Sequence, residues 1–173
     1  MTELRRPEPL DPGHHDRTRL DSGEPILDEW LRRYRGQIRR RDTAATWVIS
    51  DVAGVVVAYA SLSLAGIDRS AGSDALAKGS PDWVPALLIG RLAVDRGYAG
   101  LGVGTSLVAH VLVTAVELGA TAVCSAVVAT ALSARARSWW ERFGFDPLDP
   151  DDPEGLDLGL HTADVVATLR RLR

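Results

Sequence analysis

The chain has 173 residues, of which 46% are hydrophobic, and a formal net charge of −3. This length predicts one domain with a core of adequate size. The near-neutral charge excludes a global basic field, and the single cysteine excludes a disulfide framework. No signal peptide and no run of 18 apolar residues is visible, so we expect a cytoplasmic protein without a membrane span.

The first elements in chain order are predicted from composition and periodicity. Residues 1–17 hold several prolines and many charges, so we expect a flexible lead-in before a folded domain over 18–173. Within the lead-in, His14 and His15 stand side by side without a second cluster of metal ligands, and we expect exposed side chains and no metal site. An amphipathic helix is predicted from Asp28 to Arg40.

The β-rich runs Ala45–Ser50 and Gly54–Leu64 predict a hairpin, and a polar loop follows up to Pro85, where an apolar central strand begins. Helices alternating with strands over the rest of the chain predict one α/β sheet domain. The expected elements are a helix over Gly102–Glu117 that ends before Gly119, a strand over Thr121–Ala129, a helix over Leu132–Phe143 with Ser133 as the candidate cap, a strand over Leu156–Leu160 and a helix over Ala163–Arg171. In the first of these helices His110 is expected to be a helix-surface or packing residue, and the residues expected to face inward are Val103, Leu107, Val108, Val111 and Leu112.

The most informative segment runs from Leu87 to Thr105. It is an apolar strand, then a turn in which Gly100, Gly102 and Gly104 alternate, then an apolar helix. The first N–H groups of a helix lack partners within the helix, and the helix dipole adds positive potential there. The turn is therefore predicted to bind an anion, and a phosphate fits best.

Two common phosphate-binding turns fit this spacing poorly. The P-loop needs a lysine directly after its last glycine, and the only lysine is Lys78. The dinucleotide fingerprint needs G-x-G-x-x-G and an acid about 20 residues on, whereas the spacing here is G-x-G-x-G and Thr121–Ala129 holds no acid. A tight turn with a purely structural role is the remaining alternative.

A third pattern fits better. Ala99–Gly104 resembles the pyrophosphate loop [Q/R]-x-x-G-x-[G/A] of the GNAT acetyltransferases, with Ala99 in place of Gln or Arg. Ser138–Phe145 resembles their F-Y-x-x-F-G-F segment. The resemblance implies an α/β (α+β) GNAT fold, in which helices flank a single mixed, mostly antiparallel sheet that splays at its central strand. It also implies acetyl-CoA as the cofactor and direct acetyl transfer to a primary amine.

The resemblance extends to GNAT-type toxins of toxin–antitoxin pairs. Leu20–Leu31 looks like their F-x-C-G-x-x-x-L-D-x-[WF]-L opening. Gly90–Asp95 looks like their G-R-L-A-V-D strand, and Val57–Ser63 looks like their V-V-G-Y-Y-x-L-S strand. This implies acetylation of the α-amine of aminoacyl-tRNA, an antitoxin encoded next door, and a homodimer as in relatives. A small-molecule amine, or the N-terminus of a protein, is the alternative acceptor.

The resemblance also implies the site residues. The Val94 amide would donate to the thioester oxygen, which gains negative charge in the transition state. The residues expected to bind the cofactor are Leu92, Ala93, Val94, Ala99, Gly100, Leu101, Gly102, Val103, Gly104, Thr105, Ser106, Ser133 and Ala136.

Trp140 is the sharpest departure from the family pattern, because it stands where a tyrosine usually protonates the leaving thiolate. An indole N–H donates a hydrogen bond but cannot deliver a proton. Another group such as Tyr59, Tyr98 or a water could take the role, whereas Ser133 has too high a pKa to be a good acid. Alternatively, the protein binds CoA with weak turnover or none.

Arginines gather where RNA phosphates could dock, although a solvated helix face or a contact with an acidic partner protein explains them nearly as well. The toxin resemblance favours RNA. The residues expected to bind RNA are Arg32, Arg33, Arg35, Arg39, Arg40, Arg41 and Arg91.

Overall fold

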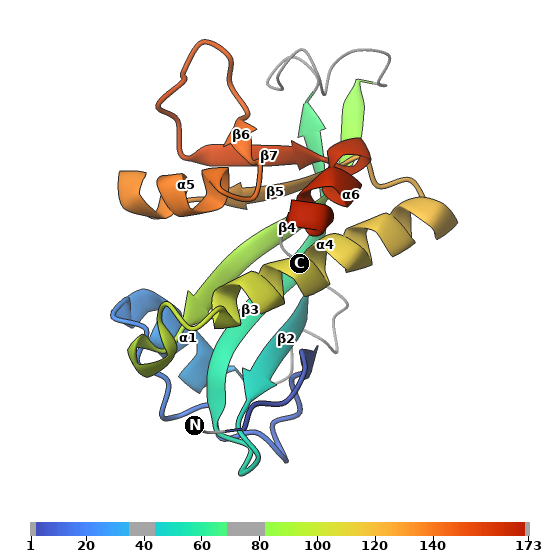
Figure 1. The fold of residues 1–173 in the computed structure, drawn as a ribbon. Coiled ribbons are helices and arrows are strands. Elements are labelled where there is room, and N and C mark those ends of the chain that lie inside the picture. Colours follow the sequence, from blue (N-terminus) through green and yellow to red (C-terminus); the bar gives the residue numbers. More distant parts are fainter. Residues whose placement is uncertain (1–2, 35–43, 69–81, 172–173) are drawn as a thin grey trace. The chain divides into compact units, whose positions relative to one another are not determined.

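The computed structural model describes residues 3–34, 44–68 and 82–171 (Figure 1). The elements of this part of the chain are β1 (Glu8–Pro9), α1 (Pro25–Arg33), β2 (Ala45–Ser50), β3 (Val56–Asp68), β4 (Trp83–Val94), the 3-10 turn η2 (Arg96–Tyr98), α4 (Val103–Thr121), β5 (Ala126–Thr130), α5 (Ala134–Glu141), β6 (Asp146–Pro147), β7 (Asp157–His161) and α6 (Thr162–Arg171).

The strands form a sheet in the order β1-β2-β3-β4-β5-β7-β6. β4 and β5 run parallel, whereas the pairs β1–β2, β2–β3, β5–β7 and β6–β7 are antiparallel. The β4–β5 register ends where Ile89 meets Ala129, and β4 continues without β5 to Val94. The predicted fold class, a mixed and mostly antiparallel sheet with helices, is confirmed.

The chain divides into two compact units. The first unit holds Met1–Ser63 and Gly90–His110, and the second unit holds Leu64–Ile89 and Val111–Arg173. The strands β3 and β4 and the helix α4 therefore each contribute residues to both units. Each unit has a hydrophobic core of its own.

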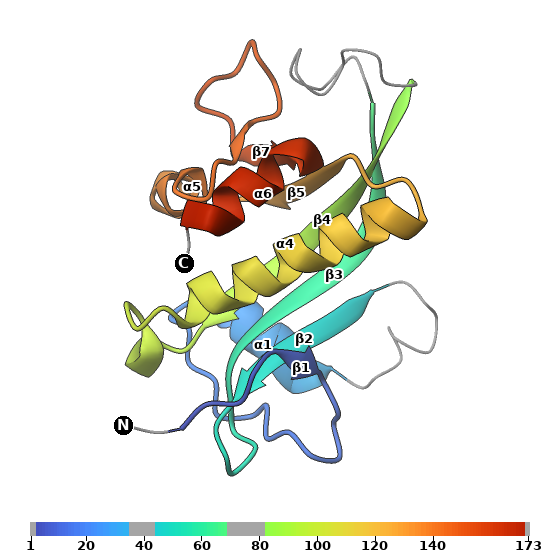
Figure 2. The ribbon, with the colours of Figure 1, turned by 45° about the vertical axis from the view of Figure 1, so that its right-hand side comes forward.

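In the first unit, α1 and the start of α4 lie on opposite faces of the strands (Figure 2). Val48 of β2 belongs to the core cluster that contains Leu27 and Leu31 of α1. The next residue along the strand, Trp47, points to the other face and packs 4.2 Å from the His110 ring of α4. His110 is thus a packing residue, as its position in the sequence predicts.

In the second unit, the core cluster consists of Ile67, Val84, Ala86, Ala126 and Val128. The N-terminus of α5 is capped by Ser133, whose hydroxyl accepts a hydrogen bond from the Ala136 amide, as predicted for a Ser at this position. The Thr168 hydroxyl of α6 donates to the Phe143 carbonyl and so links the two helical segments.

The helix α1 begins earlier than predicted because Pro25 has a fixed φ that suits the first helical turn. Before it, Gly23 takes a φ of +85°, which favours glycine. The buried Asp28 carboxylate then accepts from the amide and the hydroxyl of Ser22. The predicted extension beyond Tyr34 lies outside the described residues.

The boundary between α4 and β5 differs from the prediction. Gly119 and Thr121 lie inside α4, and β5 begins only at Ala126. Thr121 ends the helix instead of starting the strand, and its hydroxyl donates to the Glu117 and Leu118 carbonyls. Residues 122–125 lie between the two elements. The predicted inward face of α4 is confirmed by five buried residues: Val103, Leu107, Val108, Val111 and Leu112.

By length and composition α4 could cross a membrane, because an 18-residue window has a mean hydropathy of 1.6. The core helix of a soluble protein passes the same test. The buried face of α4 is that of a core helix.

The lead-in also differs from the expectation of a loose segment. β1 pairs with β2 at the sheet edge, where Pro9 is tolerated because an edge strand need not donate on both sides. His15 is buried rather than exposed. Its ring contacts the Asp11 amide through Nδ1 at 3.0 Å and the Glu8 carboxylate through Nε2 at 3.2 Å.

Candidate functional site

The glycine turn, Ala99–Thr105, follows β4 in the first unit. Gly100 and Gly102 have φ angles of +76° and +81°, in the left-handed region where a side chain is strained. A Cβ atom added at either position would meet no atom within 4 Å. The positive φ therefore explains both glycines, and the free space leaves room for a ligand to lie against the backbone.

The N-terminus of α4 adds positive electrostatic potential next to the glycine turn. The Gly102 carbonyl accepts from the Ser106 amide at 2.9 Å and so closes the first helical turn. No acidic side chain lies in that turn of α4. The unpaired amides and the dipole of a 19-residue helix favour an anion here. Ala99 adds no polar side chain, so the backbone itself must supply the donors.

The end of β4 offers a strand edge beside this turn. Past Ile89, β4 has no partner in β5, while the Asp95 amide still bonds the Val57 carbonyl of β3 at 2.8 Å. The Ala93 side chain enters the core on the α1 face, and Leu92 and Val94 therefore point to the opposite face. An unpaired edge of this kind can bind an extended chain that contains amide groups.

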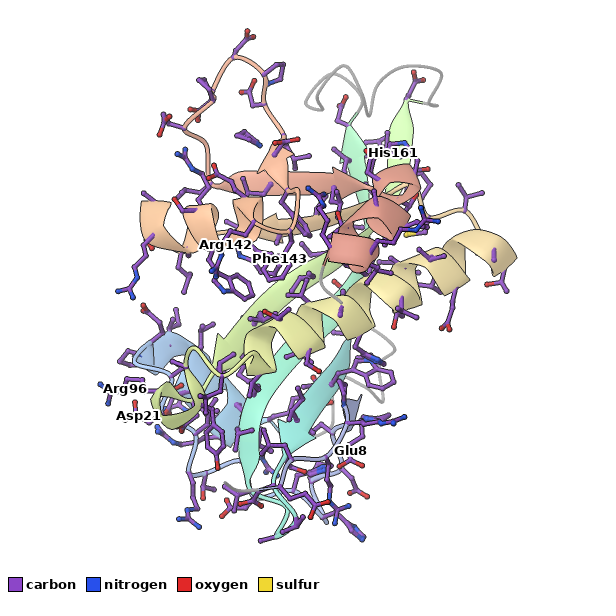
Figure 3. All side chains as sticks on the ribbon, viewed as in Figure 1. Glu8, Asp21, Arg96, Arg142, Phe143 and His161 are labelled. Carbon is purple, nitrogen blue, oxygen red and sulfur yellow. The ribbon has the colours of Figure 1, made fainter. Side chains whose placement is uncertain are left out.

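A second loop, Asp21–Glu24, contacts the chain between β4 and the glycine turn, at Asp95 and Arg96. The Asp21 amide donates to the Asp95 carboxylate at 2.9 Å, and the Arg96 amide donates to the Asp21 carbonyl at 2.9 Å. The Arg96 guanidinium also pairs with the Asp21 carboxylate (Figure 3). This hydrogen bond from Arg96 holds the pKa of Asp21 below its usual value. Sequence reasoning missed this role, although Asp21 and Asp95 both lie in the quoted motifs.

An aromatic stack lies on the α1 face of the first unit. The Trp30 ring is parallel to the Tyr59 ring within 11°, with 5.5 Å between centroids. The Arg91 guanidinium carbon lies 4.6 Å from the centroid of a Trp30 ring. Tyr59 is itself fixed, because its hydroxyl donates to the Leu27 carbonyl at 2.8 Å. Trp30 was absent from the predicted site, although the [WF] position of the opening motif falls on it.

The tyrosines that could protonate the leaving thiolate differ in burial. Tyr59 is fully buried, and desolvation raises the pKa of its hydroxyl, so it is a poor source of protons. Tyr34 is also buried and packs against Trp30. Tyr98 is half-buried, on η2 next to the glycine turn. Of the three tyrosines, only Tyr98 is not buried.

In the second unit, Trp140 belongs to what we call the aromatic segment, Trp139–Phe145. Its side chain is 6% exposed and packs against Trp139, Phe143 and Phe145, with ring centroids 5.0 to 6.4 Å apart. The Ser133 hydroxyl caps α5 and accepts from the Ala136 amide. These three predicted site residues therefore have clear structural roles within their own unit.

The predicted RNA-binding arginines fall into three groups. Arg32 and Arg33 are exposed on α1, and both form ion pairs with Glu29. Arg91 is held over Trp30 on β4. The other four, Arg35, Arg39, Arg40 and Arg41, lie outside the described residues.

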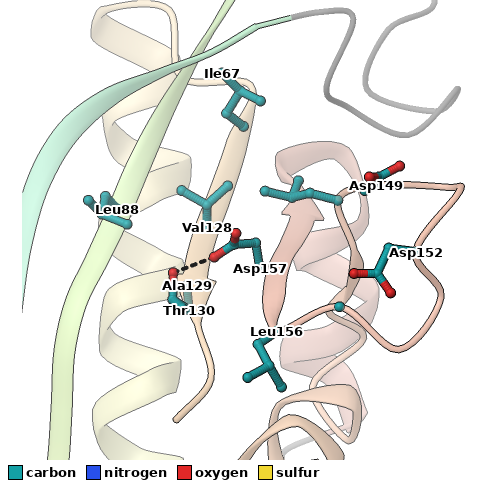
Figure 4. A pocket seen from close by; sticks show the side chains of 11 residues that line it. Ile67, Leu88, Val128, Ala129, Thr130, Asp149, Asp152, Leu156 and Asp157 are labelled. Atoms are coloured by element: carbon teal, nitrogen blue, oxygen red, sulfur yellow. Dashed lines mark hydrogen bonds between the residues drawn. The ribbon is translucent and has the colours of Figure 1, made fainter. Parts of the chain in front are cut away.

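The second unit also contains a pocket of about 420 Å³ (Figure 4). Leu88 and Val128 line its apolar part, and Asp149, Asp152 and Asp157 lie along its rim. The Thr130 hydroxyl donates to the Asp157 carboxylate at 2.6 Å. Three carboxylates repel phosphate, so this pocket is unsuited to the phosphates of a cofactor or of RNA.

A parallel strand pair whose register ends before a glycine turn at a helix N-terminus is typical of enzymes that transfer an acetyl group from a thioester of CoA. Residues 10–145 match the model of the acetyltransferase (GNAT) family. The chain belongs to this family and is an N-acetyltransferase, which confirms the predicted class of enzyme.

The relatives are toxins. A tRNA-acetylating toxin of Mycobacterium tuberculosis (strain ATCC 25618 / H37Rv) is 30% identical over 138 residues, which cover 80% of this chain and 82% of the toxin. The structure of AtaT complexed with acetyl-methionyl-tRNAfMet is 25% identical, with a TM-score of 0.82 over 95% of this chain and 98% of that one. The structure of AtaTR bound with AcCoA has a TM-score of 0.78 at 23% identity, over 95% and 96% of the two chains.

Proposed function

We propose that the protein acetylates the α-amine of aminoacyl-tRNA with acetyl-CoA and so blocks translation. The observation that carries the proposal is the glycine turn at the N-terminus of α4, next to a free strand edge. The 30% identity to a tRNA-acetylating toxin over most of both chains supports the choice of acceptor. A protein with this substrate acts in the cytoplasm.

The residues of the first unit fit the cofactor. The amides of Gly100 and of Gly102–Thr105 would hold its pyrophosphate, since they are unpaired and the turn has open space and no acid. The other two predicted donors are already bonded, the Leu101 amide to the Tyr98 carbonyl and the Ser106 amide to the Gly102 carbonyl. The backbone of Leu92–Val94 would pair with the amide-bearing arm. When bound, acetyl-CoA supplies an activated acetyl thioester. The Val94 amide is the donor that would stabilise negative charge on the thioester oxygen.

The acceptor needs little help to lose its proton. The reference pKa of an α-amine is about 7.7–8.0, so a useful fraction is neutral near pH 7. A lysine side chain, with a reference pKa of about 10.4, would need a stronger base. Positioning of the amine therefore supplies much of the rate.

Protonation of the leaving thiolate is the step with the least support. Trp140 cannot deliver a proton, and Tyr59 is fully buried. We assign the role to Tyr98 or to water. The burial of Trp140 also favours a second candidate function, a CoA-binding protein with little turnover.

The experiment is incubation of the protein with acetyl-CoA and a pool of charged tRNA, followed by mass spectrometry of the released amino acids. Acetylated α-amines are the expected product. Their absence at high enzyme concentration would refute aminoacyl-tRNA as the acceptor. A rise in melting temperature with CoA but no product would support the second candidate, because a ligand that binds only the native state stabilises it.

A toxin requires a partner that neutralises it. One similar structure, at 23% identity, shows a toxin bound to the C-terminus of its antitoxin, and we propose an antitoxin encoded by an adjacent gene. Growth arrest on expression, relieved by co-expression of the neighbouring open reading frame, is the expected result. Normal growth of cells that express the protein without the neighbouring open reading frame would contradict the toxin role.

A further inference from the structure

Arg91 is a charged side chain that forms no ion pair with a described residue. It is half-buried on β4, and no carboxylate of residues 3–34, 44–68 or 82–171 forms an ion pair with it. The contact with the Trp30 ring stabilises the guanidinium without neutralising it. A desolvated guanidinium in this state favours an anionic ligand, and its planar fork matches phosphate.

The position of Arg91 is fixed by a chain of contacts. Trp30 stacks on Tyr59, whose hydroxyl bonds the Leu27 carbonyl of α1. The buried Asp28 carboxylate holds the loop before α1 through Ser22. The cation is thus attached to the core of the first unit, which lowers the entropic cost of binding an anion.

The face on which Arg91 lies separates it from the cofactor phosphates. Arg91 and Ala93 point to the α1 face of β4, because Arg91 covers Trp30 and Ala93 contacts the core beneath α1. The glycine turn leads into α4, which lies on the other face of the first unit (Figure 2). An anion on Arg91 therefore belongs to the acceptor rather than to CoA.

We propose that Arg91, held over Trp30, binds a phosphodiester of the acceptor RNA next to the aminoacyl ester. Three strand residues, about 10 Å, separate Arg91 from Val94, whose amide is assigned to the thioester oxygen. Trp30 is then a positioning residue that acts through Arg91. This inference rests on the proposed function and adds a reason for choosing a nucleic acid over a free amino acid.

The test compares three acceptors that carry the same aminoacyl group: charged tRNA, the ester of a cytidylyl-adenosine dinucleotide with one phosphodiester, and the ester of adenosine with none. Arg91→Gln should raise KM for the dinucleotide ester by about ten- to hundredfold, the effect of losing a charged hydrogen bond. The KM for the adenosine ester and for acetyl-CoA should not change. Arg91→Lys should restore part of the loss, because it keeps the charge.

Trp30 provides a second, independent variant. Trp30→Leu should raise KM for the dinucleotide ester less than Arg91→Gln does, and Trp30→Phe, which keeps an aromatic ring, should restore it. Thermal melting checks that each variant folds.

An equal rise in KM for the dinucleotide and adenosine esters would overturn the inference, and so would an unchanged KM for the dinucleotide. A rise in KM for acetyl-CoA would assign the anion to the cofactor and would also overturn it. If the wild-type protein acetylates none of the three acceptors, the proposed function itself fails. If it acetylates all three and Arg91→Gln behaves as wild type, only this inference fails.

Discussion

The glycine turn and the aromatic segment are both family motifs, but they differ in what surrounds them. Gly100 and Gly102 border open space, whereas Trp140 and Phe145 are 6% and 0% exposed. Anion binding by a turn uses backbone amides, so a short glycine pattern is sufficient. Proton delivery needs a particular side chain, and at position 140 the side chain contributes packing instead. The comparison shows that one family motif borders open space while the other is buried in packing.

The largest expected effect concerns stability in the aromatic segment. Phe145→Ala leaves a cavity in a fully buried site, so the free energy of unfolding should fall by about 3–5 kcal/mol. Urea denaturation measures this change in the free energy of unfolding. Leu132→Ala is the control, because Leu132 is exposed and should change stability little. A loss below about 1 kcal/mol would contradict a closed aromatic core.

The next prediction concerns the glycine turn. Gly102→Val places a β-branched side chain at a φ of +81°, which should weaken acetyl-CoA binding at least about a hundredfold through strain and lost space. Isothermal titration calorimetry measures the affinity. Gly119→Ala, inside α4 and without a positive φ, is the control and should bind normally. If Gly102→Val binds acetyl-CoA with normal affinity, the glycine turn is not part of the cofactor site.

Trp140→Tyr tests whether the aromatic segment has lost its acid. We expect kcat for acetyl transfer to rise about tenfold, below the roughly 10²–10⁴-fold contributed by a positioned acid, because Tyr98 or water already serves part of the role. Trp139→Tyr makes the same change one residue earlier and should not raise kcat. A lower or unchanged kcat in the first variant would show that Trp140 does not limit turnover.

The smallest effect is expected at the Asp21–Arg96 pair beside the glycine turn. Arg96 lowers the pKa of Asp21, so the pair stabilises the fold above about pH 3.9, the usual Asp pKa, and this contribution is lost as the pH falls through the lowered value. Asp21→Asn should therefore lower the melting temperature slightly at pH 7 and not at all in strong acid. If the difference in melting temperature between the wild type and Asp21→Asn grows in acid, the stabilising role of the Asp21–Arg96 pair is wrong.

The predictions from sequence succeeded where the structure depends on near neighbours in the chain. The cap at Ser133, the buried face of α4 and the hairpin between β2 and β3 follow from local residue patterns. The end of α4 lies beyond the predicted Glu117, because Gly119 does not break the helix here.

The sequence by itself determined the glycine turn and the family, because positive φ angles and a helix N-terminus are local properties of the backbone. The tertiary structure alone decided which side chains are buried or paired. His15 is buried against a strand edge, and Tyr59 is desolvated beneath α1. The stack of Arg91 on Trp30 joins residues about sixty positions apart. Burial and such contacts depend on which distant segments meet, and no local pattern contains that information.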